Sequence, residues 1–336
     1  MRGEASRRPR PDAVPLSGLA SRAPLAGERR LRPTSTRATL VFARTVFPAT
    51  VVASLAAASA LMRAGLSPEL SVGPVVALAF ALIAGCERIF PYERAWLRPR
   101  GDVATDLGLA ALNGAVTGAL QPAVVGAGVL LARAATGVEP AAVWPDHWPI
   151  AAQLGLALLV GELFEYTAHR AMHEVPWLWR FHAPHHSAER LYWLNALRFH
   201  PVDIALVGPG KLLPVAALGA DARVFALVTV FAAVHGAFQH ANVELRLGPL
   251  NWVFSMAELH RWHHSPRLEE ANHNYGGNLI LWDVVFGTRW LPRDRRPPVE
   301  IGIESLPAFP RSLPAILLAP FRWERVVAAA ASLRPA

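Results

Sequence analysis

HRAMHEVPWLWRFHAPHH, residues 169–186, carries five of the thirteen histidines of this chain. A second run, HRWHH at residues 260–264, repeats the H-x2-HH spacing with which the first run ends. Histidines at i, i+3 and i+4 lie on one face of a helix, so each run directs several imidazoles to one place. This spacing indicates a metal site on helices rather than a set of isolated core histidines.

The number of histidines favours two metal ions over one. His240 stands between the two runs and adds to a set that one ion cannot use. Zinc is satisfied by about four ligands, whereas two irons in five- or six-coordinate sites absorb about eight or more and leave room for oxygen. Imidazole binds both metals, so ligand number rather than ligand type points to a pair of ions.

The composition indicates a membrane protein. Of the 336 residues, 53% are hydrophobic and only 17% are charged. The net charge of +8 comes from arginines, since Lys211 is the only lysine, and no basic stripe interleaved with aromatics suggests nucleic acid. We therefore assign the charge to topology and lipid headgroups. Cys86 is the single cysteine, which excludes intrachain disulfides and multi-thiolate metal sites.

The chain divides into three parts. Residues 1–38 are predicted to be a disordered basic segment, residues 39–300 a membrane domain with a histidine-rich core at 162–290, and residues 301–336 a tail with an amphipathic segment. Apolar stretches long enough to span, or nearly span, a bilayer are Thr45–Met62, Leu70–Cys86, Leu107–Ala132, Ile150–Leu163, Val202–Leu218 and Val224–Phe238. The last two are open to interpretation as a full hairpin or a re-entrant pair.

These stretches predict an all-α, polytopic bundle of about four spans plus that hairpin or re-entrant pair. Arginines crowd the connection between the second and third spans, at positions 88, 94, 98 and 100, which places this loop and the N-terminus in the cytoplasm. Counting spans from there brings all the histidine groups to the cytoplasmic side, in a helical cap. We expect an integral protein of a bacterial inner membrane.

Two carboxylates share a helix face with the first histidines. Glu162, Glu165, His169 and His173 follow i, i+3, i+7 and i+11. A carboxylate in this place can fix an imidazole tautomer or bind iron itself, and an interfacial charge is the alternative for Glu165. Pro176 is well placed to begin the next helix.

Many short motifs resemble the superfamily of fatty acid hydroxylases and sterol desaturases, which are integral-membrane di-iron oxygenases. The matching stretches are HR at 169–170 with His173, LWRFH at 178–182 with HHS at 185–187, RFHP at 198–201, FQHAN at 238–242, HR at 260–261 with HHS at 263–265, NYG at 274–276, WD at 282–283 and FGT at 286–288. The resemblance extends over about residues 88–290, in order and with matching spacing.

The resemblance implies two iron ions, O2 as co-substrate and nine ligands above a helical bundle. The implied ligands are His169, His173, His182, His185, His186, His240, His260, His263 and His264. Further candidates for direct or indirect metal contact are His235, His200, Glu162, Glu165 and Asn274. His235 lies about 140° around a helix from His240 and could join it only where the helix bulges. His200, followed by Pro201, fits an indirect role or a helix cap better.

The leading hypothesis is a membrane monooxygenase that hydroxylates or desaturates an unactivated C–H bond of a lipid. A sterol-like, fatty acyl, ether-lipid or carotenoid substrate remains open. The chain lacks a dinucleotide fingerprint and a haem-attachment motif, so a separate reductase and a small carrier are expected to bring electrons.

Two other classes of protein fit the sequence less well than a monooxygenase does. A zinc hydrolase would carry H-E-x2-H, but His173-Glu174 lacks the second histidine. A metal transporter or sensor would place ionisable groups along the membrane midplane rather than at one end.

Overall fold

The computed structural model describes residues 36–139 and 143–333, and its regular elements are helices, with two isolated β-bridges beside them. The all-α prediction is confirmed for this part of the chain. Most of the segment predicted to be disordered, residues 1–38, lies outside the described residues. Helix α1 begins at Arg37, where the Thr36 side chain accepts a hydrogen bond from the backbone N–H of Thr39.

Five helices are long and apolar enough to cross a membrane by length and composition. They are α1 (Arg37–Arg63), α2 (Pro68–Ile89), α3 (Val103–Thr136), α4 (Ile150–Glu174) and α7 (Ala222–His240). The remaining long helix, α6 (Pro201–Ala217), has 17 residues and contains Pro209 and Pro214. Its length is at the lower limit for a membrane span. The five apolar helices indicate an integral membrane protein.

Local sequence signals set the helix ends. Ser67 caps α2 by accepting from the backbone of Leu70, and Pro68 occupies the first turn, where its missing N–H costs nothing. Asp221 caps α7 in the same way, through the backbone N–H of Val224. Helix α3 ends at Thr136 and is capped by Gly137, whose φ of 67° is the left-handed conformation that glycine adopts without strain.

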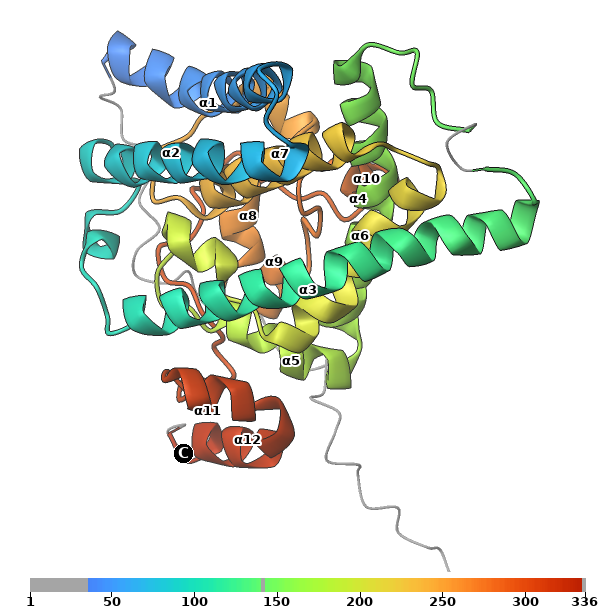
Figure 1. Cartoon of the computed structure of the whole chain (residues 1–336). Coiled ribbons are helices and arrows are strands. Elements are labelled where there is room, and N and C mark those ends of the chain that lie inside the picture. The colour runs from blue at the N-terminus through green and yellow to red at the C-terminus, as the bar shows by residue number, and fades with distance from the viewer. Residues whose placement is uncertain (1–35, 140–142, 334–336) are drawn as a thin grey trace, which may run out of the picture.

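Helix α7 is the central helix of the bundle and packs against α1 and α2 (Figure 1). Of its most apolar stretch 67% is buried, compared with 6% for α3. Helix α6 packs instead against α3 and α4. These crossings are close because glycine lies at each: a Cβ on Gly128 would be 2.8 Å from the Leu213 carbonyl oxygen, and one on Gly161 would be 2.9 Å from that of Lys211.

Short helices and turns connect the long helices, and together they are called the cap below. They are η1 (Arg94–Leu97), α5 (Pro176–His186), η3 (Trp193–Leu197), η4 (Gly248–Trp252), α8 (Ala257–His263), α9 (Leu268–Ala271) and α10 (Leu281–Val285). The arginine-rich loop belongs to this cap, because Pro91 forms a β-bridge with Val243, just beyond the end of α7. Helices α11 (Leu313–Leu318) and α12 (Trp323–Ala331), with η5 (Pro320–Arg322) between them, form a red pair at the edge of Figure 1. Their buried residues Ile316 and Val326 belong to one hydrophobic cluster with Leu109 of α3.

Candidate metal centre

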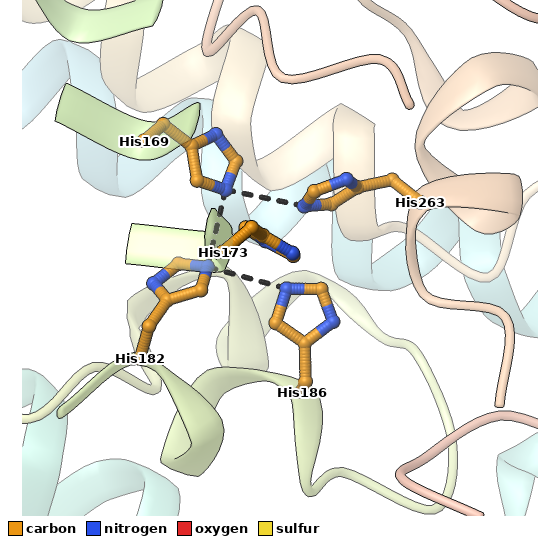
Figure 2. A group of neighbouring side chains, drawn as sticks. All are labelled: His169, His173, His182, His186 and His263. Atoms are coloured by element: carbon orange, nitrogen blue, oxygen red, sulfur yellow. Dashed lines mark hydrogen bonds between the residues drawn. The ribbon is translucent and has the colours of Figure 1, made fainter. Parts of the chain in front are cut away.

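Nine histidines from four helices gather in two adjacent groups. In each group, one possible ligand atom per residue lies within 4.8 Å of all the others. Cluster A consists of His169, His173, His182, His186 and His263 (Figure 2), and cluster B consists of His185, His240, His260 and His264. The structure therefore brings together all nine residues that the sequence singled out as ligands.

The two H-x2-HH runs are shared between the clusters. On α5, His182 and His186 belong to cluster A and His185 to cluster B; on α8, the first and last histidines of the run belong to cluster B and His263 to cluster A. The i and i+4 members of each run lie one above the other and serve one cluster, while the i+3 member turns toward the other. The rings of His186 and His264 stack with centroids 4.4 Å apart, so the clusters are in direct contact.

Hydrogen bonds fix the tautomers in cluster A. Nδ1 of His169 lies 2.6 Å from the carbonyl oxygen of Tyr275, and Nδ1 of His263 lies 2.8 Å from that of His273. A carbonyl oxygen only accepts, so both Nδ1 atoms carry the proton, and Nε2 of each neutral ring presents a bare lone pair. Burial lowers the pKa of His263 to about 3, which keeps that imidazole neutral.

The bare nitrogens nevertheless face each other. Nε2 of His169 lies 3.1 Å from Nε2 of His263 and 3.1 Å from Nε2 of His182, whose Nδ1 faces a carboxylate. Lone pairs at this distance repel unless a cation lies between them. Two nitrogens about 2.1 Å from one metal and about 90° apart would be about 3.0 Å from each other, so the spacing fits coordination by a metal.

Cluster B has the same character. Nε2 of His260 lies 2.9 Å from that of His240 and 3.0 Å from that of His264, and Nδ1 of His240 lies 3.0 Å from Oδ1 of Asn195. Within residues 36–139 and 143–333, several buried ring nitrogens have no hydrogen-bond partner: Nε2 of His173 and Nδ1 of His185, His260 and His264. Because both ring nitrogens of His235 lack a partner as well, the short Nε2–Nε2 distances, rather than the missing partners, identify the metal site of cluster B.

Three further candidate residues lie outside both clusters. His235 is fully buried among aromatic rings, with Phe231 stacked on it at 5.6 Å, and α7 continues through it without a bulge. His200 caps α6 by accepting from the backbone of Val202, as its position before Pro201 suggested. Asn274, at φ 57°, binds the backbone at positions 259 and 290, so it braces a turn instead of approaching a metal.

The two carboxylates of α4 also have partners different from those expected. Glu165 lies 2.6 Å from the ammonium group of Lys211, and Glu162 accepts hydrogen bonds from the backbone and side chain of Asn278. The expectation that they fix an imidazole tautomer directly is wrong, because the carbonyl of Tyr275 occupies that place at His169. The reason is that a loop far along the chain returns to α4.

Sequence reasoning missed Asp203, which performs the task expected of Glu165. Its Oδ2 lies 2.6 Å from Nδ1 of His182, with both side chains 2% exposed. A lone acidic residue at the start of an otherwise apolar helix, two positions after His200-Pro201, was the available signal. Asn195, which holds His240, gave no comparable signal.

The fold and the site define a class. The sequence model of the fatty acid hydroxylase family matches residues 154–288. The chain belongs to this family, and it is an oxidoreductase of the fatty acid hydroxylase type.

Particular relatives narrow the comparison. The ornithine lipid hydroxylase OlsE of Rhizobium tropici is 41% identical over 229 residues, which covers 66% of this chain and 68% of that protein. The alkylglycerol monooxygenases of Caenorhabditis elegans and Homo sapiens are 30% and 34% identical over 42% and 37% of this chain. Those matches span only 28% and 27% of the two proteins' own length. No solved structure matches the chain.

Proposed function

We propose that this protein is a di-iron monooxygenase that hydroxylates a membrane lipid with O2 and electrons from a separate reductase and small carrier. The single observation behind a bound metal is the set of lone pairs that face each other in cluster A, with their tautomers fixed by Tyr275 and His273. The second, adjacent histidine group, cluster B, is the reason for proposing a second ion. Five imidazoles exceed what tetrahedral zinc takes, so the number of ligands favours iron, which accepts five or six ligands and can leave a position open for oxygen.

The reaction class follows from the relatives. Balanced, it is R–H + O2 + 2 e⁻ + 2 H⁺ → R–OH + H2O. O2 is the oxidant, and bound iron would activate it. The chain supplies the rest. Asp203 and the loop carbonyls hold the imidazole tautomers, and the histidine rings and packed helices exclude water from the site. The membrane helices bring a lipid to it.

An amino-acid-containing membrane lipid is the substrate to test first, because one relative is an ornithine lipid hydroxylase. Cells that make ornithine lipid would express the wild type or one of two variants, His185→Ala in cluster B and His263→Ala in cluster A. Wild-type extracts should contain a lipid heavier by one oxygen atom, and both variants should lack it. Membrane insertion should persist, since both residues lie in cap helices outside the five apolar helices.

Purified protein should contain about two irons per chain, and each variant should contain less. His147→Ala, in an exposed loop, is the matched control and should retain both metal and product. Wild-type iron content in both cluster variants would exclude the di-metal site. If the wild type makes the new lipid but contains no iron, the proposed reaction would be supported and the assignment of iron as its cofactor would be rejected.

A further inference from the structure

Three ionisable side chains form a polar network between helices α4 and α6, one to two turns before His169 on α4. Glu165 of α4 pairs with Lys211 of α6 at 2.6 Å, and each side chain is less than one-fifth exposed. Glu162, one turn earlier on α4, is 1% exposed. Ionisable groups among membrane helices are expensive and are retained where they serve a function.

The network accepts hydrogen bonds from one loop of the cap, at Asn278. Asn278 donates its backbone N–H to Glu162 at 2.8 Å, and its side-chain amide donates to Glu162 and to Glu165, both at 3.1 Å. Gly277 lies so close to the same carboxylate that a Cβ there would be 2.4 Å from Cδ of Glu165. The end of the loop is thereby fixed against α4.

This loop, residues 272–278, is also the part of the chain that orients cluster A. Its acceptors hold three of the five ligands: the Asn272 side chain holds His173, the His273 carbonyl holds His263, and the Tyr275 carbonyl holds His169. Any displacement of the loop from α4 would therefore turn three imidazoles at once.

We propose that Glu162, Glu165 and Lys211 are positioning residues that seat loop 272–278 and so set the metal affinity of cluster A. The proposal rests on the metal centre proposed above. A pair of apolar residues would join α4 to α6 at no desolvation cost, whereas the carboxylates also provide acceptors for the loop's N–H groups.

Cluster B is supported by a different carboxylate, so the proposed effect is limited to the metal site of cluster A. Glu87 of α2 accepts from the backbone N–H groups of Trp193 at 2.7 Å and Asn242 at 2.9 Å. These residues flank the Asn195–His240 contact of cluster B. Changes at Glu162 or Lys211 should therefore weaken one metal site and leave the other.

The test is an anaerobic Fe²⁺ titration of the purified full-length protein. Glu162→Ala and Lys211→Met should each weaken the binding of about one of the two irons by about 10- to 100-fold, and Lys211→Arg should restore it. Double variants identify which of the two clusters has lost its iron. Adding His264→Ala to Glu162→Ala should remove both tight sites, whereas adding His182→Ala should cost nothing beyond His182→Ala alone.

Gln153→Ala is the control for general damage to α4. Gln153 is 4% exposed and receives the indole N–H of Trp144 at 2.7 Å, at the end of α4 far from the histidines. It should keep both irons. Equal metal loss in Gln153→Ala and Glu162→Ala would overturn the proposal, and so would wild-type affinity in Glu162→Ala and Lys211→Met. If those two variants bind iron like the wild type, the wild-type iron content separates the two proposals. Two irons in the wild type would support the metal centre and reject only the positioning role, whereas no iron would reject the metal centre as well.

Discussion

At the scale of single residues, Asp203 controls one ligand of cluster A. Its carboxylate accepts the Nδ1 proton of His182 at 2.6 Å, which directs Nε2 into the cluster and makes the ring a stronger ligand. Asp203→Asn keeps the shape but replaces the charged acceptor with a neutral one. We expect about a 10- to 100-fold weaker Fe²⁺ affinity at one of two sites, measured by titration. Asp294→Asn, on an exposed loop, should titrate like the wild type, and an unchanged Asp203→Asn would contradict the role.

Spacing predicted that eight of these histidines gather, because i, i+3 and i+4 positions share a helix face, whereas His240 joined the set through the family resemblance. It did not predict how they divide: His185 and His186 are neighbours in sequence but belong to different clusters, since α5 lies between partners from α4, α7 and α8. The partner of Glu165 was unpredictable for a related reason. Lys211 and Asn278 reach it only through tertiary packing.

At the scale of elements, the close crossing of α4 and α6 fixes the position of the Glu162–Glu165–Lys211 network relative to the metal centre. A Cβ on Gly161 would be 2.9 Å from the Lys211 carbonyl oxygen, which is backbone and cannot turn aside. Gly161→Ala should therefore force the helices apart and destabilise the protein by about 1–3 kcal/mol, lowering its melting temperature in detergent. Gly155→Ala, on the same helix but facing open space, should leave the melting temperature unchanged or slightly higher. Equal melting temperatures for the two variants would refute a tight crossing.

The sequence located the long helices well, since apolar runs of sufficient length have few alternatives. The predicted span Leu107–Ala132 lies within α3, and Val224–Phe238 lies within α7. The spacing of Glu162, Glu165, His169 and His173 also placed these residues on one helix, and α4 ends one residue after His173. The division of packing, with α7 against α1 and α2 but α6 against α3 and α4, depends on glycine contacts that hydropathy does not report.

At the scale of the whole molecule, the structure ties sidedness to the site. The arginine-rich loop and the end of α7 meet at the Pro91–Val243 bridge, so we expect this loop and the histidine clusters to share one side of the membrane. From the arginine asymmetry of the loops we predict that this side is the cytoplasm. Single cysteines introduced in a Cys86→Ala background should therefore react with an impermeant thiol reagent at Ala95 and Glu269 only after cells are opened.

Asp146 is the control, because its side chain is 81% exposed in the loop that joins α3 to α4 at the opposite end of α4. A cysteine there should be labelled in intact cells. Whether α6 and α7 cross fully or re-enter does not alter the result at Glu269, because both arrangements return the chain to the side that it left. Labelling of Ala95 and Glu269 on opposite sides would mean an odd number of crossings between them. The bridge from residue 91 to residue 243, and the convergence of α4 and α8 in cluster A, could not then both exist in the membrane.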